Sequence, residues 1–395
     1  LLPLAAPAGA QQQVHFSVDW KSPVVGTPDA GLAFPITEGD LLAPTAPAIG
    51  LGPLPGPTIA FTAGFGPIPG LGLNGHPGCA GHPGGTPCIV EVDGLSYGVD
   101  FAPLPGVVYA NALRFSTDEF ALGLPAAFPP NVATEGPIGE VATDVLVDAG
   151  LGVLPTPPFA AVTPGAVAFL DGDGLPAPSA FQYPGIGLRE PRLPVVTLPA
   201  TGDNLDALEI WPGGTAGTPP PLGFFFSLDA PWPDPLTGIP HSGSAPAHGF
   251  SGADVLNTPV PGAGPVMYAP APALGLDLVA GPFSDDLDAL VLTENGIPGY
   301  QPSVQPFDWA TGGTDMLLFS VRRGSAVIGM PDSIFGIPIG PGDVLTTPLP
   351  TGSGGVSPYP GMFIGAENLG LMNQRSGLAQ NDELDALDVV CRPVL

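Results

Sequence analysis

Acidic residues recur along the chain in a motif that could bind a hard metal ion. The stretch Asp285-Asp286-Leu287-Asp288-Ala289-Leu290 has close copies at residues 203–208 and 382–387. Ca²⁺ prefers carboxylate and carbonyl oxygens and takes about six to eight of them. The candidate calcium ligands are therefore the acids of the three copies: Asp203, Asp206, Asp285, Asp286, Asp288, Asp382, Glu383 and Asp385.

A structural role is the alternative for the same acids. Aspartates cap turns through hydrogen bonds to nearby backbone, and charged residues keep sheet edges soluble. The spacing of the acids differs from that of an EF-hand loop. Catalysis is a third interpretation, although repeated carboxylates are more often structural than reactive. The segment Asp171-Gly172-Asp173-Gly174 also looks like part of a calcium loop, but it is equally typical of a plain turn.

Histidines and cysteines cluster near residue 80, as His76, Cys79, His82 and Cys88. Zinc or copper would accept these side chains, but their spacing matches no common zinc-finger pattern. In an oxidising compartment neighbouring thiols pair, and the Gly- and Pro-rich segment between Cys79 and Cys88 can close a short loop. We expect a Cys79–Cys88 disulfide, with Cys391 left over.

Two patterns leave a hydrolase as the alternative function. His241 and His248 flank Ser242-Gly243-Ser244, which allows a Ser-His-Asp arrangement, but the Gly-x-Ser-x-Gly elbow of many hydrolases is missing here. A pair of acids for glycoside hydrolysis could come from any of the 36 Asp and Glu residues, and nothing singles out one pair. We therefore assign no catalytic residue and no cofactor other than calcium.

Three other landmarks precede each copy of the acidic motif in constant order. Phe-Ser occurs at residues 16, 115, 226 and 319, an Asp before an apolar run at 40, 144, 254 and 343, and an apolar-Gly-Leu triplet at 71, 186, 274 and 369. The first repeat carries a degenerate acidic motif, Val92-Asp93-Gly94-Leu95. The repeats predict a single domain, residues 14–395, with units 14–112, 113–223, 224–316 and 317–395.

Each landmark is expected to be a short strand, which gives an all-β fold. The chain starts on a Phe-Ser strand and ends on an acidic-motif strand, whereas internally each acidic-motif strand is followed by the next Phe-Ser strand. If these two strands pair in one sheet, the last sheet needs residues 384–390 beside residues 16–20, which closes a ring. The strand types at the two ends of the chain therefore predict a four-bladed β-propeller. The alternative is two tandem β-sandwich-like domains with a boundary near residues 211–223.

The order Phe-Ser-Val, Asp-Val-Leu, apolar-Gly-Leu and Asp-Asp-Leu-Asp-Ala-Leu resembles a group of uncharacterised exported bacterial proteins built from the same modules. The resemblance covers most of the chain and implies export and repetition. It implies no activity and no catalytic residue.

Composition limits the classes of partner. Gly and Pro make up 115 (58 plus 57) of the 395 residues, which favours strands and turns over helices, and apolar residues at 44% indicate a folded chain. The formal net charge is -28 and Lys21 is the only lysine, so the surface repels nucleic acid and anionic lipid, while divalent cations are natural counter-ions. No apolar run is long enough to span a membrane.

Residues 1–13 resemble the end of a signal peptide, with an apolar stretch, the small-x-small sequence Ala8-Gly9-Ala10 and then three glutamines. An ordinary Pro- and Ala-rich extension is the alternative. We expect a protein that is secreted, periplasmic or on the cell surface, with an extracellular protein or a glycan as partner. The expected function is non-enzymatic binding or structural support, with calcium as a stabilising ion and Pro- and Gly-rich loops as the binding surface. A secreted hydrolase acting on polysaccharide or ester is the alternative.

Overall fold

The computed structural model describes residues 10–45, 54–64, 70–73, 91–98, 113–118, 121, 123, 129–148, 166–175, 183–190, 202–211, 223–233, 235–236, 238, 244–259 and 262–393. Strands are the main regular secondary structure of these residues. The helical segments are single turns: α1 (Val132–Glu135), α2 (Ala245–His248) and the 3₁₀ turns Gly136–Ile138, Val141–Thr143, Ala271–Leu274, Asp308–Thr311, Thr351–Ser353, Ala366–Asn368 and Gln374–Ser376. The frequent Gly and Pro residues keep them short.

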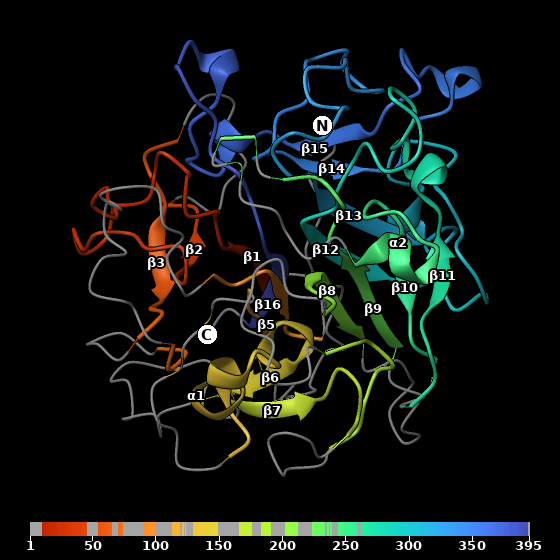
Figure 1. The fold of residues 1–395 in the computed structure, drawn as a ribbon. Coiled ribbons are helices and arrows are strands. Elements are labelled where there is room, and N and C mark those ends of the chain that lie inside the picture. Colours follow the sequence, from red (N-terminus) through yellow and green to blue (C-terminus); the bar gives the residue numbers. More distant parts are fainter. Residues whose placement is uncertain are drawn as a thin grey trace.

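The described strands form four antiparallel sheets of four strands each, called blades 1 to 4 below (Figure 1). Blade 1 contains β16 (Leu387–Pro393), β1 (Ala10–Phe16), β2 (Leu41–Ala43) and β3 (Thr58–Phe61). Blade 2 contains β4 (Gly94–Ser96), β5 (Leu113–Ser116), β6 (Val145–Asp148) and β7 (Val167–Leu170). Blade 3 contains β8 (Leu205–Trp211), β9 (Gly223–Leu228), β10 (Val255–Asn257) and β11 (Val266–Ala269), and blade 4 contains β12 (Ala289–Thr293), β13 (Met316–Ser320), β14 (Val344–Thr346) and β15 (Gly361–Ile364).

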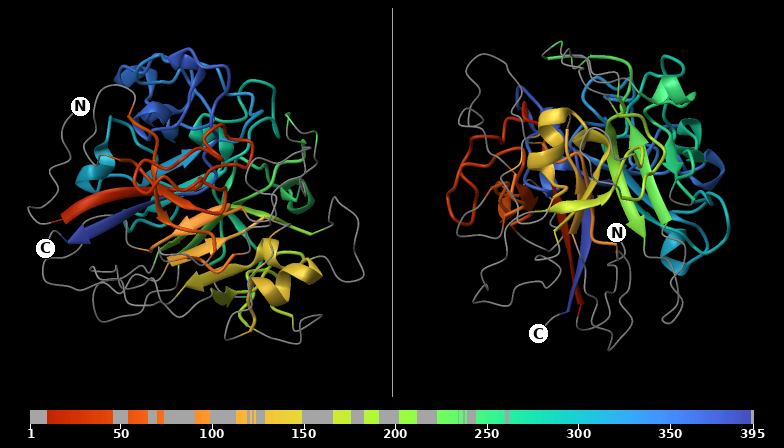
Figure 2. Two further views of the ribbon diagram at one scale, coloured as in Figure 1. Left: turned by 90° about the vertical axis from the view of Figure 1, so that its left-hand side faces the viewer. Right: turned by 60° about the horizontal axis from the view of Figure 1, so that its bottom comes forward.

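The four blades form a ring that the two ends of the chain close. Strands β16, β4, β8 and β12 contact one another at the centre, so each blade runs from an inner to an outer strand. β1 pairs with β16 along its whole length, from Ala10↔Pro393 to Phe16↔Leu387 (Figure 2). The predicted four-bladed propeller is confirmed. Tandem sandwiches are ruled out, because β8 and β9, on either side of the supposed boundary, pair within one blade.

Three of the four landmarks lie where strands were expected. The acidic motif leads into each inner strand, Phe-Ser ends the second strand, and the Asp-apolar run opens the third. The apolar-Gly-Leu triplet, however, is not a strand in any repeat. It follows the outer strands β3, β7, β11 and β15, and its glycine adopts a left-handed φ, +84° at Gly187 and +83° at Gly370. The resulting turn directs both flanking apolar side chains into the core.

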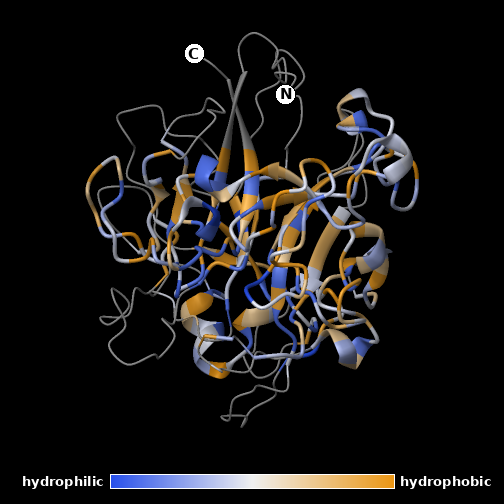
Figure 3. Cartoon of the chain, turned by 90° about the horizontal axis from the view of Figure 1, so that it is seen from above, coloured by the Kyte–Doolittle hydropathy of each residue, from blue (hydrophilic) through white to orange (hydrophobic). Residues whose placement is uncertain are grey.

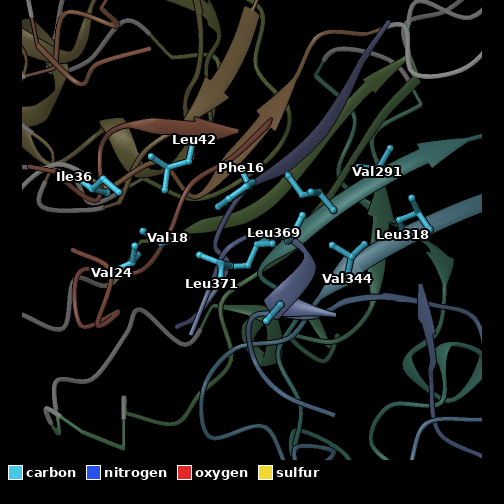
Figure 4. Packing of buried hydrophobic residues seen from close by; sticks show 14 of the residues in the cluster. Phe16, Val18, Val24, Ile36, Leu42, Val291, Leu318, Val344, Leu369 and Leu371 are labelled. Carbon is cyan, nitrogen blue, oxygen red and sulfur yellow. The ribbon is translucent and has the colours of Figure 1, made fainter. Parts of the chain in front are cut away.

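The hydrophobic core is divided among the four gaps between neighbouring blades. Between blades 4 and 1, Phe16 and Leu42 pack against Val291 and Leu318 (Figure 4). Matching clusters join blades 1 and 2, blades 2 and 3, and blades 3 and 4. Because every sheet has two apolar faces to cover, each blade needs a neighbour on both sides, and only a closed ring provides this.

The serine of each Phe-Ser landmark links its blade to the next one. Ser227 Oγ donates a hydrogen bond to the carbonyl oxygen of Leu287 at 2.7 Å. In the other three repeats the serine hydroxyl likewise donates to the backbone carbonyl oxygen of the residue just before the aspartate at the fourth position of the acidic motif. These hydrogen bonds run from Ser17 to Val92, from Ser116 to Leu205 and from Ser320 to Leu384, at 2.6, 3.3 and 2.7 Å. All four hydroxyls are fully buried. The repetition of Phe-Ser in the sequence therefore has a physical cause, which is contact between blades.

We predict that Ser227→Ala destabilises the fold by about 1–2 kcal/mol, because it removes a buried donor from a buried carbonyl group. The shift of the urea unfolding midpoint measures this loss. Ser376→Ala is the matched control, since Ser376 is exposed, and it should shift the stability by less than about 0.5 kcal/mol. Equal midpoints for the two variants would contradict the proposed role of the serine.

Candidate metal centre on the propeller axis

The first aspartate of the acidic motif acts as a clamp between blades. Asp285 accepts backbone N–H groups from Asp277 and Val327, at 2.6 and 2.8 Å. Asp382 joins blades 4 and 1 through two backbone N–H groups in the same way, and Asp203 joins blades 2 and 3. These three acids thus have the structural role that was the alternative to calcium binding.

The later acids of the motif instead gather at the axis, where the inner strands begin. Asp206 of blade 3 repels Asp286 and Asp288 of blade 4. Asp288 in turn repels Glu383, and Asp385 repels both Asp288 and Glu383. Five of the eight predicted ligands, drawn from three blades, are therefore brought together.

Sequence reasoning missed further acids at the same place. Asp229 follows Phe226 by three residues, and the same offset gives Asp19 and Asp118. Asp93 belongs to the degenerate motif of the first repeat and Glu91 directly precedes that motif. Glu91 interacts with both Asp93 and Asp385. The constant offset from Phe-Ser was the signal that could have found the first three. We call the following ten acids the axial cluster: Asp19, Glu91, Asp93, Asp118, Asp206, Asp229, Asp286, Asp288, Glu383 and Asp385.

Two arginines offset part of this negative charge. Arg322 Nη1 lies 3.2 Å from Asp286 Oδ2 and 3.4 Å from Asp229 Oδ1, and its guanidinium stacks over the Trp232 ring at 4.7 Å. Arg323 Nη2 bonds Asp19 Oδ1 at 3.0 Å and Glu383 Oε2 at 2.9 Å. Two positive charges face ten acids, so the fully ionised cluster has a formal excess of eight negative charges. The hydropathy colouring shows hydrophilic segments among the hydrophobic strands of the ring (Figure 3).

Several axial oxygens are buried without a hydrogen-bond partner among the described residues. They are Asp206 Oδ2, Asp286 Oδ1, Asp288 Oδ2 and Asp385 Oδ2. Exposure of these four residues ranges from 0% for Asp286 to 9% for Asp385. A buried carboxylate oxygen with no partner is costly, because water no longer solvates its charge.

Burial and mutual repulsion raise the pKa of these acids. The pKa of Asp286 is raised to about 6 by desolvation, although Arg322 opposes the rise. Desolvation raises that of Glu383 to about 7, against the effect of Arg323. The pKa values of Asp206, Asp288 and Asp385 lie well above the ordinary range. Desolvation is the main cause, and repulsion by neighbouring carboxylates raises these pKa values further. The cluster therefore favours either bound protons or a bound cation.

The geometry is compatible with a shared metal ion. One oxygen each from Asp206, Asp229 and Asp286 lies within 4.8 Å of the other two. Two oxygens that each lie about 2.4 Å from one Ca²⁺ are at most about 4.8 Å apart. A second triad with the same property lies in blade 2 and is formed by the buried Asp144 and Asp171 and the partly buried Glu190. Both triads could hold a metal ion such as Ca²⁺.

The remaining sequence candidates give no catalytic arrangement among the described residues. His248 Nε2 lies 2.7 Å from Asp203 Oδ2, so a His-Asp pair does form. Ser244 Oγ, however, accepts the backbone N–H of Asn204 at 3.5 Å, and none of the hydrogen bonds seen in the described part of the chain joins a serine to His248. The other histidine of that pattern, His241, and the predicted Cys79–Cys88 disulfide with His76 and His82 lie outside the described residues.

Comparison with known proteins adds no assignment. No known protein family, curated protein or solved structure matches this chain. In the parts of the chain that the structure describes, no helix is both long and apolar enough to cross a membrane. The case for a function therefore depends on the geometry of the axial cluster.

We predict that the metal-free protein loses stability as the pH rises. The folded-state pKa values of Asp286 and Glu383, about 6 and about 7, exceed those of the unfolded chain, so the folded state holds extra protons in mildly acidic solution. That stabilisation is complete below the ordinary pKa of about 4 and is lost as the pH passes through the folded values. The melting temperature in EDTA should thus fall between about pH 5 and about pH 8. A melting temperature that rises over this interval would contradict the raised pKa values.

Proposed function

We propose that this protein is an exported, non-enzymatic binding scaffold, a four-bladed propeller whose axial cluster is stabilised by a bound divalent cation, best matched by Ca²⁺. The observation that carries the proposal is that Asp206, Asp288 and Asp385 each have a buried oxygen with no hydrogen-bond partner among the described residues. Export is supported by the signal-like pattern of residues 1–13.

The donor atoms favour calcium over softer metals. The axial cluster offers only carboxylate oxygens, and among the described residues no Cys or His belongs to a group of possible metal ligands. Zn²⁺ and Cu²⁺ prefer nitrogen and sulfur ligands, whereas Ca²⁺ accepts many oxygens in flexible geometry. Acids from all four blades surround the axis, which provides the large number of oxygens that Ca²⁺ needs.

The burial of the cluster disfavours the hydrolase alternative. A glycoside hydrolase needs two carboxyl groups on either side of a bound sugar. Asp206, Asp288 and Asp385 are at most 9% exposed, so a polysaccharide cannot reach them without opening the ring. The raised pKa values of these acids follow from burial and mutual repulsion, which a bound cation would relieve, and they do not require access to a substrate.

Two rigid loops support a role in binding a partner. Asp29 accepts backbone N–H groups from Gly31, Leu32 and Phe34, and Asp332 organises its own loop in the same way. An isolated bridge closes each loop, Pro28↔Pro35 in blade 1 and Pro331↔Pro338 in blade 4. Both loops present large apolar side chains to solvent: Leu32, Phe34, Phe335 and Ile337, at 39–56% exposure. Ordered loops with exposed apolar tips fit an extracellular protein or glycan surface.

We predict that EDTA lowers the melting temperature at about pH 8 and that Ca²⁺ restores it, with about 2.7 kcal/mol of stabilisation at about 100 times the dissociation constant. The effect should shrink at about pH 5, because protons then compete for the same oxygens. Thermal melting followed by circular dichroism measures both. A melting curve that is unchanged by either reagent at both pH values would refute a stabilising axial ion.

Asp288→Asn should separate cation binding from a purely structural role. It removes a charge from the middle of the cluster, so in EDTA we expect a melting temperature at or above that of the wild type, together with a loss of most of the gain from Ca²⁺. Asp308→Asn is the control, since it changes the net charge equally at a partly exposed loop outside the cluster. An Asp288→Asn protein that is destabilised in EDTA but still gains fully from Ca²⁺ would identify Asp288 as a structural cap.

A further inference from the structure

Blade 2 carries a second group of carboxylates, beside its outer strands and away from the axis, of which two are buried and one is partly buried. Asp144 precedes β6, Asp171 follows β7, and Glu190 follows the apolar-Gly-Leu triplet of this repeat. One oxygen from each of the three lies within 4.8 Å of the others. As on the axis, this spacing fits ligands of a single Ca²⁺ with bonds of about 2.4 Å.

Asp144 and Asp171 are held in place by hydrogen bonds that fix the direction of their carboxyl groups. Asp144 Oδ2 accepts the hydroxyl of Tyr183 at 2.7 Å, and its Oδ1 accepts the N–H of Gly172 at 3.3 Å. Asp171 Oδ1 accepts the N–H groups of Asp173 and Gly174 at 3.1 and 2.7 Å. The acids are therefore positioned before any ligand arrives, which reduces the entropic cost of binding.

Glu190 reaches the other two acids because residue 172 has no side chain. Its Oε1 accepts the Thr143 hydroxyl at 3.0 Å. A Cβ at Gly172 would lie 2.5 Å from Glu190 Oε1 and 2.2 Å from Thr143 Oγ1, so any other residue would push both groups away. The Asp-Gly-Asp-Gly segment is thus more than a turn, because its first glycine makes room for a third carboxylate.

A fourth acid points independently to a missing ligand. Glu140 is 5% exposed, and its Oε1 has no hydrogen-bond partner among the described residues. Its charge is repelled by Glu135, Asp171 and Asp173, which places it on the side of the triad. Glu140 shares a side-chain hydrogen bond with Glu135, and the described groups that raise its pKa are all carboxylates. A positive charge nearby would relieve this repulsion.

Blade 4 shows what fills the corresponding position in another repeat. Asp343 is the counterpart of Asp144, since each opens the third strand of its blade. Both Nη atoms of Arg375 bond Asp343, and Nη2 also bonds Glu367 Oε2 at 2.9 Å. A single arginine therefore suffices for two acids there.

Blade 2 has far more negative charge around the same position. Six acids interact here: Glu135, Glu140, Asp144, Asp171, Asp173 and Glu190. Arg192 stands four residues after Leu188, as Arg375 does after Leu371, and it lies outside the described residues. If Arg192 paired fully with this group, five of the six negative charges would remain. In blade 4 only one remains, because Arg375 faces the two acids Asp343 and Glu367.

We propose that blade 2 holds a second Ca²⁺ site, formed by Asp144, Asp171 and Glu190 with Glu140 nearby, which is separate from the axial cluster. The site takes a divalent cation where blade 4 uses an arginine. It lies between the third and outer strands of one blade, so the bound ion fixes the loops that follow them. This proposal does not depend on the axial ion.

Terbium luminescence tests the site directly, because Tb³⁺ occupies calcium sites and is excited by nearby aromatic rings. Tyr183 donates to Asp144, so excitation of tyrosine should give Tb³⁺ emission that added Ca²⁺ quenches. The double variant Asp171→Asn/Glu190→Gln should lose this emission and bind one Ca²⁺ fewer in calorimetric titration. Glu367→Gln, which removes the second acid bound by Arg375 in blade 4, should change neither. Unchanged Ca²⁺ stoichiometry in the double variant would overturn the proposal.

Two further variants identify the occupant. In Asp288→Asn protein the tyrosine-sensitised emission should persist, because this site is separate from the axis, and its loss would mean that the two sites are one. Arg192→Ala should leave Ca²⁺ binding at the blade 2 site intact. If this site binds Ca²⁺ only after Arg192→Ala, the arginine is the natural occupant and the proposal is wrong.

Discussion

Repulsion among carboxylates at the axis is the constraint on which the rest of the propeller depends. Ten acids share a space that solvent scarcely reaches, and two arginines cannot balance them. The same acids also hold the ring together. Asp286 accepts the backbone N–H of Ala230 from the preceding blade at 3.1 Å, and Glu91 accepts that of Trp20 at 2.8 Å. The fold cannot remove these charges without losing contacts between blades, so it has to neutralise them where they are.

Ring closure and neutralisation are linked because blade 1 comes from both ends of the chain. Glu383 and Asp385 precede β16, whereas Asp19 follows β1, and these acids meet only when the two strands pair. Arg323 of blade 4 bonds both Asp19 and Glu383, so it connects the two ends through their charges. A cation held by the complete cluster binds only the closed ring, and by mass action it stabilises closure.

The ring could be predicted from sequence because the prediction needs only the order of the landmarks along the chain. An error in the bounds of a single strand does not change that order. The outer strands could not be predicted from sequence. In β11, for example, Val266 and Met267 are half exposed, so this edge strand needs no repeated pattern of apolar residues. The roles within the acidic motif were also beyond sequence reasoning. Asp285 and Asp288 are the same residue type in the same motif, so the sequence does not distinguish them. In the folded protein Asp285 accepts the backbone N–H of Val327, whereas Asp288 is buried among the acids at the axis.

Departures from the repeat show where the protein controls its charge. Perfect repetition would place four aspartates three residues after the Phe of each Phe-Ser pair, but the fourth position is Arg322, which bonds Asp229 and Asp286. Asn204 likewise replaces an acid in blade 3. Both changes reduce repulsion on the side of blades 3 and 4, while Asp288 and Asp385 each keep an oxygen with no hydrogen-bond partner in the described part of the chain. Exact symmetry would have placed an acid at residue 204 and an aspartate in place of Arg322, which would have raised the formal excess at the axis from eight negative charges to eleven. The two substitutions therefore lower the repulsion that ring closure has to overcome.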